Sequence, residues 1–367
     1  MSGQAVLLLV AISARALAVA ARRAGYAVVA IDAFGDGDAR SAADAMEVVE
    51  NAMEGFAEVE LAPVVARLAQ AYGPAGLIYG SGFDDCPARL AEIARVVPLL
   101  GASPESLARA KDPQVFARSC QAAGIAHPEI RFSPPDAPAQ WLLKRRGGSG
   151  GLHVAAATAR ARKLGDYWQR RVEGGAVSLL FVRDGQALTP IAWSEQWSAP
   201  CAATPFRYGG AAGPIAVDAP RGLLAALARL TRRLGIRGLA SADFLNDGEQ
   251  LWLLEINPRP GATLDVFDDD NDPLLTRHID AIVGRRPAPS KPRAPRAAEI
   301  VYAEADAAAP QGDWPHWGAD RPAPGTRIPA GAPLCTVLAA GASAAEAKAQ
   351  VRERSRRIQS WLQEGGR

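Results

Sequence analysis

The stretch Leu253-Leu254-Glu255-Ile256-Asn257-Pro258-Arg259-Pro260 places an acid, an amide and a guanidinium at alternate positions, directly after an apolar run. In an extended chain, alternate side chains share one face, so Glu255, Asn257 and Arg259 are predicted to project the same way. Two oxygen ligands beside a fixed cation suit a Mg²⁺–phosphate complex, because hard oxygens hold the metal and arginine binds phosphate. The alternative is a strand end that carries ordinary solvated polar residues.

A second acid, Asp243, lies in the preceding apolar run, and Asp247-Gly248 predicts a hairpin turn between the two. A plain two-residue loop there would pair Asp243 with Trp252 and turn Glu255 to the other face of the hairpin. The two acids share a face only if the loop has an odd length or a strand carries a bulge. The sequence therefore predicts one of these, and a tight turn without a bulge would count against a metal site.

A third feature is the glycine cluster Gly147-Gly148-Ser149-Gly150-Gly151, which follows an apolar stretch ending at Lys144. The pattern from Trp141 to Val154 predicts a strand, a glycine loop and a second strand. Glycines let backbone N–H groups approach phosphate oxygens, and Lys144 adds a point charge at the base of the loop. The spacing matches neither common nucleotide-binding fingerprint, so an exposed flexible hairpin is the alternative.

Together these features resemble the ATP-grasp superfamily, because four elements occur in the order typical of that family. They are the glycine loop after Lys144, the hinge-like stretch Gln169-Arg170-Arg171-Val172-Glu173-Gly174, Asp243, and Glu255-Ile256-Asn257-Pro258-Arg259. The spacing from Asp243 to Glu255 is similar to that of the biotin carboxylase branch. The resemblance covers roughly residues 1–285.

Two further segments narrow the resemblance. Ala108-Arg109-Ala110-Lys111-Asp112, before a predicted helix that ends at Gly124, resembles a lead-in of the superfamily. Phe206-Arg207-Tyr208-Gly209-Gly210 and Pro214 resemble a group of predicted ATP-dependent carboligases and carboxylate–amine ligases related to biotin carboxylase.

The resemblance implies an α/β fold with α+β lobes. We expect a Rossmann-like pre-ATP-grasp domain over residues 1–103, an ATP-grasp domain over 104–288, and a linker with a small C-terminal appendage over 289–367. Within the ATP-grasp domain, the lid would span about 115–177 and the C-terminal lobe about 178–288.

The same resemblance assigns roles to residues. Candidates for ATP binding are Lys111, Lys144, Gly147, Gly148, Ser149, Gly150, Gly151, Gln169, Arg170, Val172 and Glu173. Asp243, Glu255 and Asn257 would hold Mg²⁺, with Mn²⁺ as the alternative metal. Arg259 and Lys144 are the catalytic candidates, because the first would stabilise the transferring phosphoryl group and the second would offset charge on the triphosphate.

The N-terminal third alternates apolar runs with helical stretches, which predicts a parallel sheet with strands at Ala5–Ile12, Ala27–Asp32 and Gly76–Tyr79. Ligands of such sheets collect at the carboxyl ends of the strands. Candidates for substrate contact are therefore Asp32, Asp36, Asp38, Ser81 and Asp84, joined by Arg207 and Tyr208 from the later segment. For the first five, ordinary loop and cap chemistry is the alternative.

Composition sets limits on the class of protein. The chain has 367 residues, which predicts two or three domains, and a net charge of +2, too balanced to argue for nucleic acid or membrane. Its four cysteines are scattered, as in a reduced, cytoplasmic protein. The run Ala5–Ile12 is too short to span a bilayer and follows no basic segment, so no signal peptide is expected.

Two C-terminal features have less specific patterns. The acidic run Asp265–Asp272 combines a helix start, with Asp272 as cap and Pro273 at the first position, and a solvated loop. A separate metal site is not favoured there, and amine binding is the minor alternative. Beyond it, residues 285–296 predict a linker or a strap, followed by strands near 298–304 and 332–338 and a helix near 344–362.

The function that the resemblance implies is ATP-dependent ligation, with a small carboxylic acid and an amine as substrates and ADP and phosphate as products. Family context adds a hint of one-carbon cofactor assembly, of the methanopterin or methylofuran type. The alternatives are a carboxylase-like enzyme with a non-amine nucleophile and a non-catalytic, nucleotide-binding regulatory protein. The sequence allows a homodimer and names neither the acid nor the nucleophile.

Overall fold

A computed structural model describes residues 4–157, 165–286 and 288–363. The N-terminal part is a parallel sheet in the order β3-β2-β1-β4. Its strands are β1 (Val6–Val10), β2 (Ala27–Asp32), β3 (Ala45–Val48) and β4 (Gly76–Tyr79). Its helices are α1 (Arg15–Arg23), α2 (Gly37–Ala42), α3 (Leu61–Tyr72) and α4 (Pro87–Ile93). The predicted parallel sheet is confirmed, because strands buried on both faces read as continuous apolar runs. β3 was not predicted.

The next part holds two helices and a small antiparallel sheet. The helices are α5 (Pro104–Lys111) and α6 (Pro113–Ala123), followed by the 3₁₀ turn η1 (Pro138–Gln140). The sheet has the order β5-β8-β6-β7, with β5 at Ile130–Arg131, β6 at Trp141–Arg145, β7 at Ala155–Ala156 and β8 at Asp166–Arg170. α6 begins at Pro113 because Asp112 accepts hydrogen bonds from the first free N–H groups, and it ends at left-handed Gly124.

Within the described residues, a second sheet of eight strands runs β13-β12-β9-β10-β11-β14-β18-β16. The strands are β9 (Gly175–Arg183), β10 (Leu188–Ser198), β11 (Tyr208–Ile215), β12 (Gly238–Asn246), β13 (Leu251–Asn257), β14 (Arg296–Tyr302), β16 (Gly318–Ala319) and β18 (Pro333–Ala340). The C-terminal strands thus continue the same sheet rather than forming a separate one. A small ribbon pairs β15 (Ala307–Ala308) with β17 (Arg327–Ile328).

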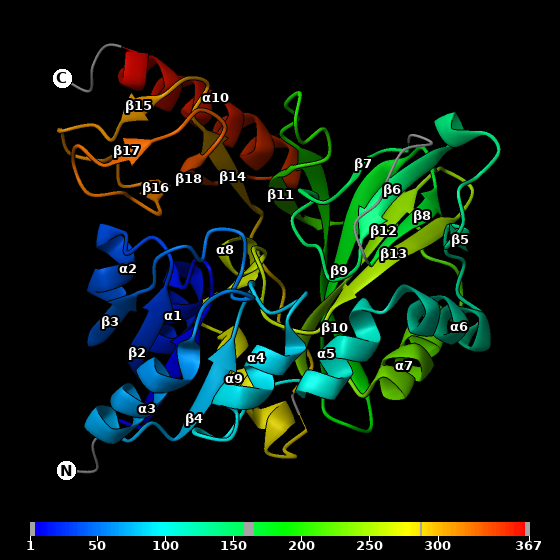
Figure 1. Ribbon diagram of the computed structural model, residues 1–367, viewed down its shortest axis with the longest axis horizontal. Coiled ribbons are helices and arrows are strands. Elements are labelled where there is room, and N and C mark those ends of the chain that lie inside the picture. The colour runs from blue at the N-terminus through cyan, green and yellow to red at the C-terminus, as the bar shows by residue number, and fades with distance from the viewer. Residues whose placement is uncertain (1–3, 158–164, 287, 364–367) are drawn as a thin grey trace.

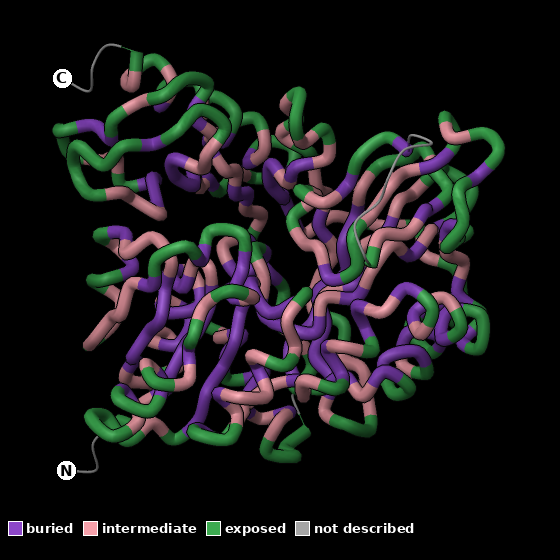
Figure 2. Tube along the Cα trace, viewed as in Figure 1, coloured by how far each residue is buried: buried purple, intermediate pink, exposed green. Residues whose placement is uncertain are grey.

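Helices cover this sheet at different places (Figure 1). They are α7 (Leu223–Leu234), α8 (Leu264–Phe267), α9 (Leu274–Ile282) and α10 (Ala344–Gln363). One apolar core joins α6 and α7 to β9, β12 and β13. Another runs from α1 and β1 to α8 and α9, so the N-terminal sheet and the large sheet share buried side chains. Figure 2 shows strands such as β1, β2, β9 and β12 as largely buried, whereas β3 and β10 are mostly of intermediate exposure. No helix among the described residues is long and apolar enough to cross a membrane.

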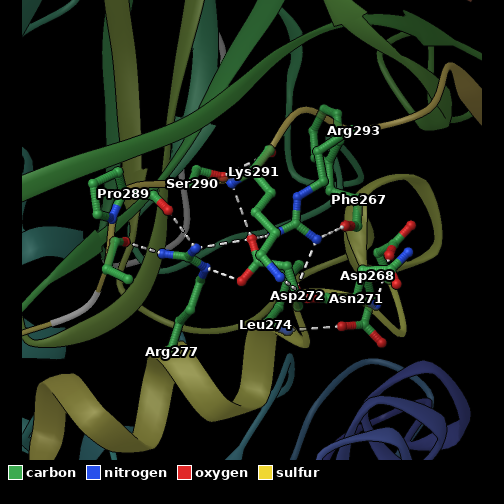
Figure 3. Close-up of polar contacts among 12 residues, drawn as sticks. Phe267, Asp268, Asn271, Asp272, Leu274, Arg277, Pro289, Ser290, Lys291 and Arg293 are labelled. Carbon is green, nitrogen blue, oxygen red and sulfur yellow. Dashed lines mark hydrogen bonds and ion pairs between the residues drawn. The ribbon is translucent and has the colours of Figure 1, made fainter.

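The chain after α9 is held against that helix by paired charges (Figure 3). Asp272 receives the guanidinium groups of Arg277, at 2.7 Å, and of Arg293. Arg277 also donates to the carbonyl of Pro289 at 2.9 Å, and Arg293 to that of Phe267 at 2.7 Å. The predicted linker or strap is therefore a strap, fixed by buried arginines rather than free in solvent.

The acidic run proves to be mostly a set of arginine partners, so the predicted solvated loop is largely wrong. Asp265 pairs with Arg15, Asp268 and Asp270 with Arg23, Asp269 with Arg296, and Asp272 with Arg277 and Arg293. The predicted cap is also displaced. Pro273 itself occupies the cap position, and the acid that accepts the N–H of Leu274, at 2.8 Å, is Asp268.

Candidate active site

The hairpin that carries the two acids contains the predicted bulge. Asp243 is paired with Glu255, whereas the next residue, Phe244, is paired with Leu253. Leu254 is therefore the extra residue of the return strand, and it shifts the parity so that both acids lie on one face. Without the bulge, the same turn would direct Glu255 away from Asp243.

A lysine ammonium lies among the oxygens of this hairpin. Lys111, the last residue of α5, places Nζ 2.7 Å from Oδ1 of Asn257, 3.0 Å from Oε2 of Glu255 and 3.2 Å from Oδ1 of Asp84. The amide Nδ2 of Asn257 donates to Oδ2 of Asp243 at 2.8 Å. These oxygens therefore converge on a point that accepts positive charge.

Arg259 enters the same network from the loop after β13. Its Nε and Nη2 lie 3.2 and 3.1 Å from Oδ2 of Asp84, which follows β4 of the N-terminal sheet. Arg259 is 8% exposed and Asp84 is 4% exposed, so the pair is well shielded from water. Asp84, a candidate for substrate contact, thus holds both Lys111 and Arg259.

The electrostatics separate the two acids of the hairpin. Burial raises the pKa of Asp243 to about 7, and the neighbouring charge of Glu255 adds to the effect. Burial also acts on Glu255, but the cations Lys111 and Lys144 outweigh it and lower the pKa of Glu255 to about 2. Glu255 is therefore the acid that stays ionised. An additional cation would favour the ionised form of Asp243 most, because the pKa of Asp243 is raised.

The glycine loop is packed between two other segments, so the alternative of a freely exposed hairpin does not hold. A Cβ on Gly151 would lie 1.9 Å from the carbonyl oxygen of Phe206, and one on Gly147 would lie 2.5 Å from that of Asp84. Gly150 accepts a hydrogen bond from the N–H of Tyr208 at 2.9 Å. Glycine is needed at 147 and 151 because the backbones approach too closely for a side chain.

Lys144 and His153 flank the inner side of this loop. Lys144 lies on β6, half-buried, and burial lowers its pKa. Burial and the nearby Lys144 lower the pKa of His153 to about 4, so its ring is neutral at pH 7. The Nδ1 atom of His153 is buried and has no hydrogen-bond partner among the described residues. His153 therefore offers an unused polar atom, a role that the sequence did not reveal.

The hinge-like stretch, residues 169–174, lines a cavity that the glycine loop also borders. Gln169 is 2% exposed, and its Nε2 has no partner among the residues that the structure describes. Arg170 and Val172 also line the wall, while the exposed side chains of Arg171 and Glu173 pair with each other at 2.8 Å. A polar atom buried without a partner is costly unless a ligand satisfies it, so Gln169 is a good contact for a nucleotide base.

Apart from Asp84, which is not among the lining residues, these groups line one cavity of about 1400 Å³. It extends from the hinge and the glycine loop, past the hairpin acids, to the carboxyl ends of β1, β2 and β4 and the chain between β16 and β18. Ser81 and Tyr208 line it, as expected for substrate candidates. Arg207 also lines it, but its guanidinium donates to carbonyls of Ala199 and Gly331 and stacks 3.5 Å from the ring of Tyr302.

Comparisons with known proteins agree with this geometry. Residues 112–263 match the family model described as an ATP-grasp domain. Residues 112–263 are thus similar in sequence to an ATP-grasp domain. A search of curated proteins found none whose sequence matches.

Solved structures share the whole fold at low identity. A biotin carboxylase from Campylobacter jejuni, solved as a β,γ-ATP complex, aligns with a TM-score of 0.70 and 12% identity over 95% of this chain and 90% of that one. N5-carboxyaminoimidazole synthetase from Staphylococcus aureus aligns with a TM-score of 0.69 and 12% identity over 96% of this chain and 97% of that one. N5-carboxyaminoimidazole ribonucleotide synthetase from Thermus thermophilus aligns with a TM-score of 0.67 and 18% identity over 95% of this chain and 98% of that one.

The residues of the ATP-grasp domain fit a hard divalent cation. The donors are two carboxylates and one amide oxygen, and a cation, the ammonium of Lys111, already lies against two of them. Among the described residues no cluster of three or more His, Cys, Asp or Glu side chains could hold a metal by itself. A bound metal would therefore need further oxygens, which phosphate groups supply.

The sequence also left Ser178 unnoticed. This residue of β9 is opposite Asp243 in the sheet, and its hydroxyl donates to Oδ1 of Asp243 at 2.5 Å. A single hydroxyl in the otherwise apolar run Val177–Val182 was the available signal. Ser178 fixes the carboxylate whose pKa burial raises, and so helps to set the direction in which it faces.

Proposed function

We propose that the protein is an ATP- and Mg²⁺-dependent carboxylate–amine ligase that works through an acyl phosphate and releases ADP and phosphate. The observation that carries the proposal is the pair of cations Lys111 and Arg259. Asp84 holds both beside the hairpin acids, and both line a cavity that the glycine loop borders. A protein that only bound a nucleotide would not need a buried guanidinium at the phosphoryl end.

The chain's own groups divide the work. Lys144, the glycine N–H groups and the neutral ring of His153 face the region that a triphosphate would occupy, where they would offset its charge. Asp243, Glu255 and Asn257 would hold Mg²⁺, which would neutralise phosphate oxygens as the γ-phosphoryl group leaves. Gln169 and the hinge backbone would bind the base.

Arg259 is placed to act on the acid. A carboxylate oxygen attacks the γ-phosphorus, the bond to the ADP oxygen breaks, and an acyl phosphate forms. The amine nitrogen then attacks the carbonyl carbon, the bond to the phosphate oxygen breaks, and the nitrogen loses a proton. The guanidinium of Arg259, fixed by Asp84, stabilises negative charge on the transferring group, and Lys111 adds a second cation nearby.

Product analysis with a panel of acids tests the proposal. The panel includes bicarbonate, because a fold relative was solved with MgADP and bicarbonate, and acids that resemble precursors of methanopterin- and methylofuran-type cofactors. We expect ADP and phosphate, and with hydroxylamine in place of the amine, a hydroxamate. Release of pyrophosphate, or ATP binding with no acid-dependent turnover, would contradict the proposal and favour a regulatory nucleotide-binding protein.

Arg259→Ala should reduce hydroxamate formation on the order of 100-fold while ATP binding changes little, since one transition-state donor is typically worth that much. Arg285→Ala, at an exposed arginine that pairs with Asp280 at 3.5 Å, is the matched control and should behave like the wild type.

A further inference from the structure

A second cluster of charges lies at the end of the cavity formed by the N-terminal sheet and the C-terminal strands. Five carboxylates surround the buried guanidinium of Arg15: Asp32, Asp36, Asp38, Asp265 and Asp320. They come from three parts of the chain: the segment from the end of β2 into α2, the start of α8, and the residue after β16. The guanidinium of Arg321 also lies 3.9 Å from Asp38, so five acids share two arginines at this end of the cavity.

Four of these acids have defined structural partners. Asp32 accepts the backbone N–H groups of Ala14, Phe34 and Gly35, at 2.6 Å each. Asp38 accepts those of Asp320 and Arg321, at 2.9 Å each. Asp265 and Asp320 bind Arg15, with Nη2 at 2.7 and 2.8 Å from their respective Oδ2 atoms. These four hold the three parts of the chain together.

Asp36 differs from them. It is 7% exposed, and within the described part of the chain its side chain has no hydrogen-bond or ion-pair partner. It precedes α2 as the cap residue, a place where an acid normally accepts a hydrogen bond from its own helix, but no such bond is formed. Its side chain lines the cavity together with those of Arg15, Asp265 and Asp320.

A carboxylate in this position is unfavourable without a ligand. Burial, together with the charges of Asp320, Asp32 and Asp38, raises the pKa of Asp36 to about 8, and the more distant Arg15 does not compensate. A buried ionised acid needs either a proton or a cationic partner. An ammonium group supplies three donors and one positive charge, and it would find Asp36 and the neighbouring acids within one wall of the cavity.

We propose that Asp36 receives the ammonium group of the amine substrate, at the end of the cavity opposite the hinge, so that Asp36 is a binding residue for the nucleophile. One proton leaves this ammonium group to solvent before its nitrogen attacks the acyl phosphate. That the bound amine is a substrate rests on the proposed function, whereas the amine-binding site itself rests on the geometry of the acids. It predicts that the ligand is a primary amine and that a neutral or anionic nucleophile binds there poorly.

Titration of the full-length protein tests the site directly. The probes are a series of primary alkyl- and arylalkylamines, the alcohols of the same carbon skeleton, and amino acids, followed by calorimetry and by the shift in melting temperature. We expect at least one amine to bind at millimolar concentration or below, and its alcohol not to bind. Asp36→Asn should weaken that amine roughly 10- to 100-fold, the effect of losing one charge-assisted hydrogen bond.

Glu50→Gln also replaces a carboxylate by its amide, but at an exposed position of the N-terminal part. It is the matched control and should bind the amine like the wild type. Without ligand, Asp36→Asn should melt at or above the wild-type temperature, because the acid makes no bond that the fold needs. In turnover, the variant should raise KM for the amine and leave hydroxamate formation from acid and ATP unchanged.

The outcomes separate this inference from the proposed function. Amine binding that fails in Asp36→Asn supports the site even if no acid supports ATP turnover, in which case only the ligase proposal fails. Hydroxamate formation together with amine binding that Asp36→Asn leaves intact would overturn the site and keep the ligase. A wild type that binds no amine of the series, or a variant that melts well below it, would also overturn the site.

Discussion

Lys111 shows how a single side chain connects the parts of the site. It ends α5, yet its ammonium lies among oxygens from β13 and from the loop after β4. Lys111 is a buried ion and its partner Glu255 is half-buried. Lys111 has several partners, which is the condition under which a buried charge is tolerated. A metal arriving at these oxygens would compete with Lys111, and the lysine would then be free to face phosphate.

Glu255→Gln should abolish turnover and leave the protein folded. The amide keeps the size of the side chain, and Lys111 keeps Asp84 and Asn257 as partners, but the site loses the acid that is always ionised. We expect kcat to fall on the order of 100-fold or more, as for other groups that compensate charge in a transition state. The measurement is steady-state ADP release at several Mg²⁺ concentrations.

Glu249→Gln is the control, because Glu249 lies in the exposed turn of the same hairpin. Unchanged rate and unchanged Mg²⁺ dependence in Glu255→Gln would remove Glu255 from the metal site.

The alternation of Glu255, Asn257 and Arg259 was enough to predict that these side chains face one cavity, since strand geometry is local. Their partners could not be predicted in the same way. Asp84 and Arg259 are 175 residues apart in the chain, and Lys111 is 144 residues from Glu255. Such pairs depend on how whole elements pack, which a local pattern does not record.

Among the elements, the β12–β13 hairpin and the glycine loop show two kinds of local constraint. The hairpin needed a bulge, and the position of the acids predicted one before its place, Leu254, was known. The glycine loop was predicted as a loop, but its contacts with Phe206 and Asp84 were not. The sequence shows that glycine frees the backbone there, and only the fold shows which backbone comes close.

Gly151→Ala and Gly150→Ala form a matched pair for this element. Both glycines have positive φ, +72° and +63°, so an alanine costs similar backbone strain at either position. Only at Gly151 would the new Cβ meet another backbone, the carbonyl of Phe206, whereas at Gly150 it meets nothing within 4 Å. We therefore expect Gly151→Ala to raise KM for ATP by roughly tenfold more than Gly150→Ala does. Equal effects would mean that the packing against Phe206 is unimportant.

In the whole molecule, the expected appendage is an extension of the large sheet, and it meets the N-terminal domain at Arg15. That guanidinium pairs with Asp265 of α8 and with Asp320 beyond β16, so one side chain ties three parts of the chain. No local pattern in the sequence couples Arg15 with Asp320, an acid 305 residues away. The tie closes the cavity on the side opposite the hinge.

Arg15→Ala should destabilise the protein strongly, because it leaves two buried carboxylates without their cation, a loss of about 3–5 kcal/mol in comparable cases. Arg22→Ala, on the same helix, removes a partly exposed pair with Asp44 and should cost no more than about 1 kcal/mol. Melting temperatures of both variants at pH 7 measure the difference. Equal effects would show that the Arg15 cluster adds little to the packing of the three parts.

The pH dependence of stability should carry the signature of Asp36. Its pKa rises from 3.8 to about 8 in the folded protein through burial and the charges of Asp320, Asp32 and Asp38, against the opposing charge of Arg15. Between about pH 4 and pH 8 the folded state then binds a proton that the unfolded state has lost, so the free energy of unfolding falls as pH rises. The Asp36→Asn variant has no such proton, so its free energy of unfolding should fall less steeply with pH, by up to about 1.4 kcal/mol per pH unit.

The two proteins share every other titrating group, including Asp243, so the difference between their melting curves isolates Asp36. The advantage of Asp36→Asn should grow through this window and level off above pH 8. A saturating primary amine should remove it in the wild type, because a bound ammonium replaces the proton as partner of the carboxylate. Parallel stability profiles from pH 4 to pH 8 would show that Asp36 is ionised in the free protein, and that the cavity already satisfies it.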